Sequence, residues 1–207
     1  MSGPDARTAM LARIRSALTA QLEEVEVPRD YERSPLSGKG DVDRFADATA
    51  EYRARVHRID TTAISTTIAS LVATGQPVAV PADVPKEWIE RVDTVVDVPG
   101  APLTVEQLDL VGAVVTGCAL GIAVTGTLVL DAGATQGRRA LTLVPDHHIC
   151  VVFTDQIVDS VPEAFSALNP TSPLTFISGP SATSDIELNR VEGVHGPRTL
   201  DVLLVDR

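Results

Sequence analysis

The run Thr125-Gly126-Thr127 places a glycine between two hydroxyl side chains, inside a stretch that otherwise predicts a strand. A turn of this composition can direct backbone N–H groups and hydroxyls at an anion. Threonine and glycine also make ordinary tight turns. Two interpretations therefore stay open: an anion-binding turn, or a turn with a purely structural role.

Two adjacent arginines, Arg138 and Arg139, follow a glycine-rich segment that contains Gly133 and Gly137. Guanidinium groups bind carboxylates and phosphates through paired hydrogen bonds. The two arginines are therefore candidates for clamping a small carboxylate or phosphate. The alternative is a solvated surface turn in which they pair with neighbouring carboxylates.

His148 and Cys150 lie two residues apart at the start of a predicted strand, so their side chains would project from the same face. A metal site or a Cys/His nucleophile needs a third group at a recognisable spacing, and we find none in the sequence. Cys150 lies among apolar residues, which is more typical of a core position. We expect His148 to be a hydrogen-bonding or acid/base group at the strand end, and we expect no metal site.

Two further loops bring polar groups together near the C-terminus. Ser178, Gly179 and Ser181 end a predicted strand, and Asp185 then lies in the first turn of a predicted helix. Ligands often bind where a strand of an open α/β sheet gives way to a helix. His195 lies between glycines, where the backbone can approach a ligand closely. The plainer alternatives are a capped helix and a structural turn histidine.

The elements that must position these residues alternate along the chain. Helical spacing and capping signals predict helices between Pro4 and Pro28, from Asp41 to near Arg55, after Thr61 or Thr62, from Pro85 to Arg91, after Thr104, from Val158 to Leu168, and after Ser184. Thr104 with Gln107 and Ser184 with Glu187 are the predicted capping boxes. Short apolar runs predict strands at 56–59, 77–80, 94–98, 114–115, 128–130, 141–144, 149–153, 174–178 and 200–205.

Short apolar runs separated by helices are typical of parallel strands buried on both faces. The strands at 128–130, 141–144 and 149–153 have no helix between them, which favours hairpin-like pairing of neighbours. We therefore predict an α/β sandwich of three layers with a mixed, mostly parallel sheet. Residues 1–40 are expected to form a helix and a loop or linker, and residues 41–207 the α/β domain.

Composition excludes several classes of protein. The 207 residues have a net charge of −11, which disfavours broad binding to nucleic acid or to anionic membranes. The only cysteines are Cys118 and Cys150, too few for an iron–sulfur centre on this chain. The N-terminal segment is charged and amphipathic, which is not typical of a secretory signal, and glycines interrupt the longest apolar stretch. We expect a cytoplasmic protein without a membrane span.

Taken together and in this order, these motifs resemble the LUD domain family. The matching residues are Ala123, Thr125 to Leu130, Arg138 or Arg139, Leu143, Pro145, His148-Ile149, Ile177 to Ser181, Thr183, Asp185 to Glu187, and Gly193 to Pro197. The resemblance extends from about Val56 to Asp206. Its most specific parts are Ser-Gly-Pro-Ser followed by Asp-Ile-Glu, and Gly-Val-His-Gly-Pro.

The resemblance implies a fold similar to the sugar-phosphate isomerase and CoA-transferase-like superfold. It also implies a three-component system that oxidises L-lactate to pyruvate, in which the partner lactate utilization proteins hold the iron–sulfur clusters. The low cysteine count fits a subunit that holds no cofactor itself. One residue departs from the family pattern: many relatives have a glutamate immediately before Thr-Gly-Thr, where this chain has Val124. A carboxylate cannot act as an acid, base or nucleophile at that position here.

Three functional hypotheses follow from these patterns. The first is an accessory subunit for lactate oxidation that binds a small anion through Thr125 to Thr127, Arg138, Arg139, Ser178, Ser181 and His195. The second is a stand-alone isomerase or cyclo-ligase-type enzyme with His148 or Asp185 as acid/base groups. The third is a structural module whose anion site has decayed. Whether the chain is itself an enzyme stays open at this point.

Overall fold

The structure is a computed structural model, and it describes residues 5–18, 26–29, 40–183, 191–192 and 196–206. It divides into two units, residues 1–31 and 32–207. The first unit contains α1 (Ala6–Ala17), a helix with no buried side chains. It ends at Ala17, whereas the sequence predicts a helix that extends toward Pro28. The boundary that the sequence places between residues 40 and 41 stays a prediction.

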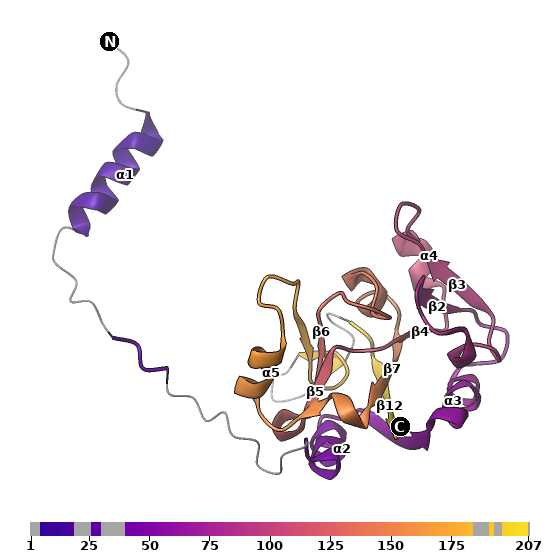
Figure 1. Cartoon of the computed structure of the whole chain (residues 1–207). Coiled ribbons are helices and arrows are strands. Elements are labelled where there is room, and N and C mark those ends of the chain that lie inside the picture. Colours follow the sequence, from indigo (N-terminus) through magenta and orange to yellow (C-terminus); the bar gives the residue numbers. More distant parts are fainter. Residues whose placement is uncertain (1–4, 19–25, 30–39, 184–190, 193–195, 207) are drawn as a thin grey trace. The chain divides into compact units, whose positions relative to one another are not determined.

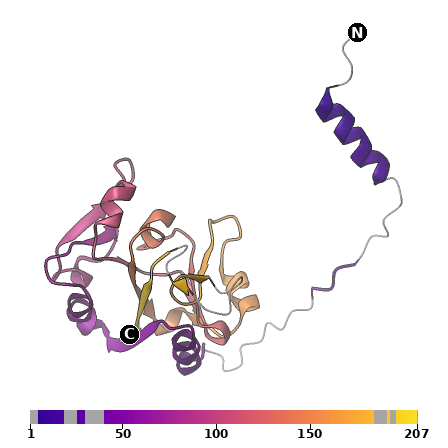
Figure 2. The same ribbon diagram turned by 180° about the vertical axis from the view of Figure 1, so that it is seen from behind.

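The second unit is built on a six-stranded sheet in the order β1-β12-β7-β4-β2-β3, and every neighbouring pair runs parallel (Figures 1 and 2). Its strands are β1 (Arg55–Asp60), β2 (Val78–Pro81), β3 (Thr94–Asp97), β4 (Ala113–Thr116), β7 (His147–Phe153) and β12 (Thr199–Asp206). The inner strands β2 and β4 are buried throughout, and β7 and β12 are buried except at their ends. The predicted mostly parallel α/β sheet is confirmed.

A smaller four-stranded sheet has the order β8-β5-β6-β9. Its strands are β5 (Leu120–Ile122), β6 (Thr127–Leu130), β8 (Ile157–Val158) and β9 (Thr175–Ile177). β6 pairs antiparallel with β5 and with β9, whereas β8 runs parallel to β5. A separate antiparallel pair joins β10 (Ala182–Thr183) to β11 (Val191–Glu192).

Short helices cover these sheets. The α-helices of the second unit are α2 (Val42–Glu51), α3 (Ile64–Leu71), α4 (Val105–Asp109) and α5 (Val161–Ala167). Single turns of 3-10 helix are η1 (Thr61–Ala63), η2 (Lys86–Trp88), η3 (Ala123–Thr125), η4 (Arg139–Thr142) and η5 (Thr154–Gln156). The capping box predicted at Thr104 and Gln107 starts α4, and a similar box of Ser160 and Glu163 starts α5.

Successive apolar side chains of the central strands point to opposite sides, so both faces of the six-stranded sheet are apolar. On one face, α3 packs through Ile64 and Ile68 against residues of β2, β4, β7 and β12. On the other face, α2 packs through Phe45 against β6, β7 and β12. The outer face of the small sheet packs against α5 through Ala164. The small sheet therefore lies between α5 and the core that it shares with the large sheet.

Three local predictions are wrong. Residues 141–144 are not a strand, because Arg139–Thr142 form η4 and bury Leu141 while Leu143 stays exposed. Short apolar runs do not distinguish a strand from a helical turn. The predicted helix at Pro85 to Arg91 is only the 3-10 turn η2. The expected hairpin-like pairing of neighbours among the runs 128–130, 141–144 and 149–153 is also absent in the described part of the chain, because the middle run is not a strand and β6 and β7 lie in different sheets.

The cap ahead of α3 also differs from the prediction. Asp60, not Thr61 or Thr62, accepts the free backbone N–H groups of Thr62 and Ala63, at 2.9 and 3.1 Å. The capping box predicted at Ser184 and Glu187 lies outside the described residues. In the part of the chain that the structure describes, no helix has both the length and the apolar character needed to cross a bilayer.

Gly126 allows the connection between β5 and β6 to lie directly against α2. Its φ is +56°, and a Cβ atom there would lie 2.4 Å from the backbone nitrogen of Thr49 and from the carbonyl carbon of Ala48. Only glycine fits this position, because both the backbone conformation and the space exclude a side chain. Gly75 has a similar positive φ of +83° but nothing within 4 Å of a Cβ position.

We therefore predict that Gly126→Ala lowers the free energy of unfolding by about 3 kcal/mol, the sum of left-handed strain and overpacking. Gly75→Ala is the matched control and should cost only the strain, about 1 kcal/mol. Urea unfolding followed by circular dichroism measures both. Equal losses for the two variants would show that the contact with α2 is unimportant.

Candidate functional site

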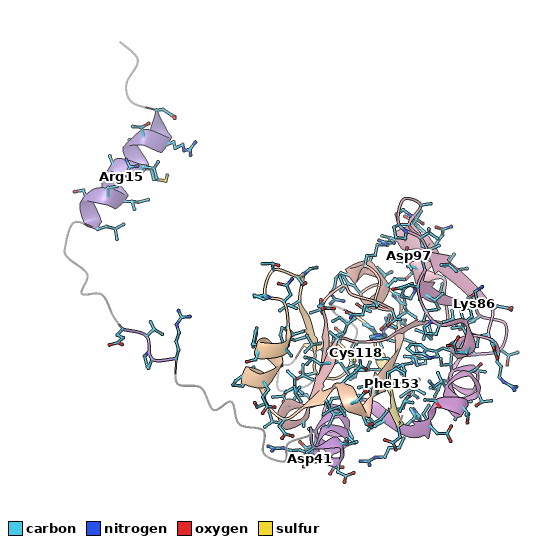
Figure 3. The ribbon with its side chains drawn as sticks, viewed as in Figure 1. Arg15, Asp41, Lys86, Asp97, Cys118 and Phe153 are labelled. Carbon is cyan, nitrogen blue, oxygen red and sulfur yellow. The ribbon has the colours of Figure 1, made fainter. Side chains whose placement is uncertain are left out.

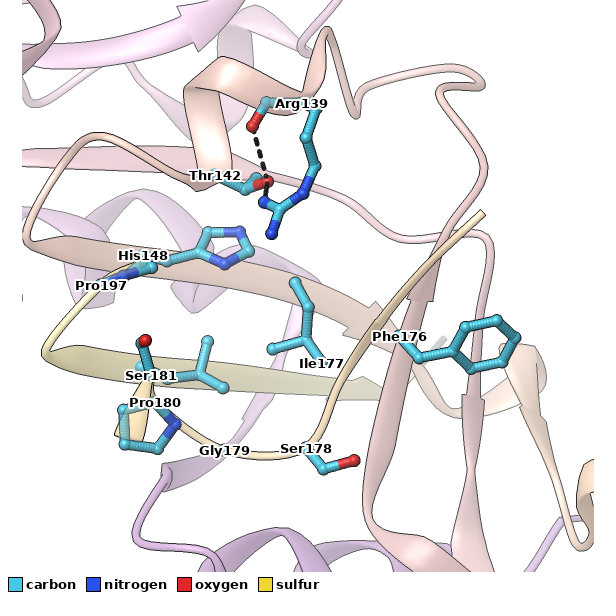
Figure 4. A pocket seen from close by; sticks show the side chains of 11 residues that line it. Arg139, Thr142, His148, Phe176, Ile177, Ser178, Gly179, Pro180, Ser181 and Pro197 are labelled. Atoms are coloured by element: carbon cyan, nitrogen blue, oxygen red, sulfur yellow. Dashed lines mark hydrogen bonds between the residues drawn. The ribbon is translucent and has the colours of Figure 1, made fainter. Parts of the chain in front are cut away.

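A pocket of about 230 Å³ opens at the amino-terminal ends of β7 and β12 (Figure 4). Its walls come from η4, the start of β7, the end of β9 with the loop that follows, and the start of β12. The lining residues are Arg139, Thr142, His148, Phe176, Ile177, Ser178, Gly179, Pro180, Ser181, Pro197 and Leu200. Segments that are far apart in the sequence thus enclose one small space.

Arg139 supplies the positive charge of this pocket. One guanidinium NH1 donates to Thr142 Oγ1 at 2.7 Å, and the Thr142 hydroxyl donates back to the Arg139 carbonyl at 3.3 Å. These bonds, drawn in Figure 4, hold the side chain along η4 with the guanidinium directed toward His148. Burial lowers the pKa of Arg139, but a guanidinium stays cationic in proteins. Among the described residues only Thr142 accepts a bond from this guanidinium, which leaves further N–H donors for a ligand.

Arg138, in contrast, does not line the pocket. Its Nε and NH2 groups bind the two oxygens of Asp97 at 2.9 and 3.0 Å, and NH2 also donates to the Leu103 carbonyl. Burial works to raise the pKa of Asp97, but the bonds from Arg138 and the Leu103 N–H outweigh it and lower that pKa. The two arginines that the sequence groups together thus have different roles in the structure.

His148 lies at the inner wall of the pocket and is only 1% exposed. Its Nε2 atom is 2.8 Å from the hydroxyl of Thr116, which lies on the neighbouring strand β4. This bond fixes the orientation of the imidazole ring, whose edge Figure 4 shows facing the space between Arg139 and Ile177. The ring therefore presents a hydrogen-bonding edge to the pocket.

A chain of hydroxyl groups lies beside the pocket. The Thr127 hydroxyl is 2.7 Å from Ser178 Oγ and also donates to Thr125 Oγ1 at 2.7 Å. In Figure 4 the Ser178 hydroxyl accordingly points away from Arg139. Gly179, with φ +83°, passes so close to α2 that a Cβ would lie 2.3 Å from the Tyr52 carbonyl oxygen. The loop after β9 is thus fixed by its contacts with both β6 and α2.

The structure brings together some of the residues predicted for the site. Arg139, His148, Ser178, Gly179 and Ser181 line one pocket. Thr125 and Thr127 join it only through Ser178, and the N–H groups of Val124 and Gly126 donate to backbone carbonyls. Asp185 and His195 lie outside the described residues. A ligand-binding or catalytic role for each of these residues stays a prediction.

Sequence reasoning missed Thr142 and the apolar wall formed by Ile177 and Leu200. It also missed a buried charge cluster on the opposite face of the sheet. Asp201 of β12 is fully buried and lies between the side chains of His57 and His147, whose Nε2 atoms are each 2.6 Å from one of its oxygens. An aspartate inside the apolar run Leu200 to Val205 was the signal that could have revealed this cluster.

Arg55 also binds the Asp201 carboxylate, so this anion is held by groups from β1 and β7 on both sides of β12. Burial works to raise the pKa of Asp201, but the hydrogen bonds from its three partners outweigh it and lower the pKa to about 2. Among the described residues, no three His, Cys, Asp or Glu side chains form a group that could hold a metal ion. Hydrogen bonding is therefore the role that the geometry of this cluster supports.

The pocket thus combines one guanidinium, one imidazole, hydroxyls and an apolar wall, a set suited to a small carboxylate. The model of the LUD domain matches residues 42–205. The chain belongs to the LUD domain family.

Two sequence relatives and one solved structure support this assignment. Lactate utilization protein C of Deinococcus radiodurans is 43% identical over 209 residues, which cover 99% of this chain and 97% of that protein. Lactate utilization protein C of Bacillus pumilus is 39% identical over 93 residues, which cover 41% of this chain and 38% of that protein. The crystal structure of a DUF162 family protein from Deinococcus radiodurans matches with a TM-score of 0.67 and 39% identity, covering 79% of this chain and 95% of that one.

The buried Asp201 cluster predicts a defined pH dependence. A carboxyl whose pKa is lower in the folded than in the unfolded chain stabilises the fold above pH 4, and this contribution disappears as the pH falls toward 2. Asp201→Asn should therefore lower the free energy of unfolding by about 2 kcal/mol near neutral pH. Urea unfolding of both proteins from pH 7 to pH 2.5 would measure this difference, which should shrink below pH 4. A difference that stays constant would contradict the assignment.

Proposed function

We propose that this protein is an accessory subunit of a lactate utilisation system and that it binds a small carboxylate in the pocket around Arg139. The observation that carries the proposal is its 43% identity, over nearly the whole chain, to a protein named Lactate utilization protein C. The pocket gives independent support, because its groups match the parts of a small hydroxy acid.

L-Lactate has a carboxylate, a hydroxyl and a methyl group on adjacent atoms. A guanidinium such as Arg139 binds a carboxylate through charge-assisted hydrogen bonds. The imidazole of His148 is a partner for the hydroxyl, and Ile177 and Leu200 offer an apolar wall for the methyl group. The pocket volume of about 230 Å³ suits a ligand of this size.

Oxidation of L-lactate to pyruvate removes two electrons, which a partner must accept. We propose iron–sulfur partner proteins for this role, because a cluster takes about four cysteine ligands and this chain has only Cys118 and Cys150. Val124, which is 41% exposed, offers no carboxylate at the position where many relatives have glutamate. We therefore assign binding and orientation of the ligand to this subunit, in the cytoplasm, and electron transfer to its partners.

Substitution of the two neighbouring arginines tests the binding site. Arg139→Ala should weaken the binding of L-lactate about tenfold or more, because the charged donor at the pocket is lost. Arg138→Ala is the matched control and should leave binding unchanged, while the loss of its bonds to Asp97 lowers the free energy of unfolding by about 2 kcal/mol. Isothermal titration calorimetry and urea unfolding measure the two effects.

If Arg139→Ala does not affect the binding of L-lactate, the ligand does not bind in this pocket. A reversed result, in which only Arg138→Ala weakens binding without loss of stability, would place the ligand near Asp97 instead. Binding of D-lactate and acetate in parallel separates recognition of the whole hydroxy acid from recognition of a carboxylate alone.

The cellular role has its own test. Deletion of the gene should abolish growth on L-lactate as sole carbon source in a strain without another lactate dehydrogenase, and the intact gene should restore it. Anaerobic affinity purification of the tagged chain should recover brown partners with iron–sulfur absorbance. Normal growth of the deletion strain, together with a colourless chain purified alone, would contradict the proposal.

A further inference from the structure

The six-stranded sheet has a second opening, at the carboxyl-terminal ends of its strands. The parallel strands β2 and β4 are neighbours in this sheet. After β2 the chain turns to the face covered by α3, where Trp88 is buried. After β4 it turns to the other face, where Cys118 is buried. Neighbouring connections that leave toward opposite faces open a crevice at the carboxyl ends of the strands, and open α/β sheets bind ligands in such crevices.

A groove of about 820 Å³ lies at this crevice. Trp88 follows β2, Cys118 follows β4, Phe153 ends β7 and Leu168 follows α5, and all four line the groove. Figure 3 labels Cys118 and Phe153 in the interior of the second unit. The groove shares no lining residue with the pocket around Arg139, so it is a separate site.

Hydrogen bonds within the chain fix the walls of this groove. The Gln156 side chain donates to the Cys118 carbonyl and accepts the Phe153 backbone N–H, both at 2.9 Å. The Asp131 backbone N–H donates to Gln136 Oε1 at 2.7 Å, and Gln136 Nε2 donates back to the Asp131 carboxylate at 2.8 Å. The groove is therefore largely preformed, as is usual for small-molecule sites.

Two aromatic rings form part of the groove wall. The ring centroids of Trp88 and Phe153 are 6.0 Å apart, and the ring planes are tilted by 50°. Trp88 is 7% exposed and Phe153 is half-buried. Both line the groove, so a ligand bound there contacts aromatic carbon, which accommodates apolar groups and also attracts cations to the ring faces.

The charges of the groove all have one sign. Among the described residues that line it, the charged side chains are Glu87, Asp131 and Asp155, and no lysine, arginine or histidine is present. Glu87 and Asp155 are exposed, and Asp131 is half-buried. A surface lined by one sign of charge concentrates ligands of the opposite sign. The groove therefore favours a cation, whereas the pocket around Arg139 favours an anion.

We propose that this groove binds a small organic cation, an amine whose ammonium group contacts the carboxylates and whose apolar body lies against Trp88 and Phe153. The inference goes beyond the proposed role in lactate utilisation and does not depend on it, because it rests on residues that the pocket around Arg139 does not contain. β7 would then connect two sites of opposite charge preference, with His148 near its start and Phe153 at its end.

The test uses Trp88 as its reporter, because it is the only tryptophan in the chain. The full-length protein is titrated with phenethylamine, which is cationic, with the neutral phenethyl alcohol and with the anionic phenylacetate. Tryptophan fluorescence and isothermal titration calorimetry follow binding. We expect saturable binding of phenethylamine, about tenfold weaker binding of the alcohol, and no binding of phenylacetate at this groove. Equal binding of the three probes, or neither heat nor a fluorescence change with phenethylamine, would overturn the proposal.

A double variant tests the charges. Glu87→Gln with Asp155→Asn removes two exposed carboxylates of the groove and should raise the Kd for phenethylamine about fivefold. Glu90→Gln with Asp93→Asn is the matched control, because it changes the net charge equally at two exposed carboxylates that do not line this groove. The control should bind like the wild-type chain. Equal affinities of the two double variants would overturn the proposal.

A ring substitution tests the apolar wall. Phe153→Leu keeps an apolar side chain but removes the aromatic face, so it should weaken the binding of phenethylamine several-fold by calorimetry. Phe165→Leu is the control, because it removes an exposed ring that does not line the groove. Circular dichroism establishes that each variant is folded. If Phe153→Leu does not fold, the two double variants at exposed positions still decide the outcome.

Discussion

The parallel pairing of β12 with β7, from Thr199 to Val205, is the interaction on which the rest of the structure depends. It places residues of the chain's last strand beside residues that precede them by about fifty positions, and it joins β1 and β4 into one sheet. Because both faces of these strands are buried, the register has little freedom: a shift of one residue would exchange every core side chain between the two faces. The buried Asp201 reinforces this register, since its partners lie on β1 and β7.

Because side chains alternate between the two faces of a strand, two groups of polar residues are separated at the amino-terminal ends of β7 and β12. His147 and Asp201 face the side covered by α3, where they form a closed set of hydrogen bonds and charges. His148 and Leu200 face the small sheet and line the pocket around Arg139. The neighbouring histidines thus lie in different surroundings, His147 in the buried charge cluster and His148 at the pocket, because successive side chains of a strand point in opposite directions.

The small sheet gives the pocket its other wall. β9 and the loop after it are fixed by the hydroxyl contact between Ser178 and Thr127 and by the close approach of Gly179 to Tyr52. The Thr-Gly-Thr turn therefore holds Ser178, a residue of the pocket wall, in place. Its glycine is needed because a side chain there would collide with the backbone of α2. Cys118 and Cys150 belong to the buried core between the two sheets.

The sequence by itself determined the parallel α/β class, several strand positions, the cap at Thr104, the LUD resemblance and five residues of the pocket. Apolar periodicity, capping and motif order are local, so they can be read along the chain. Only the tertiary structure decided that Arg139 and not Arg138 lines the pocket, and that residues 139–142 form η4. It also decided that β6 pairs with β5 and β9, and that Arg55, His57 and His147 surround Asp201. These outcomes depend on which distant strand lies alongside, and strand order is fixed by burial across the whole sheet rather than by any local pattern.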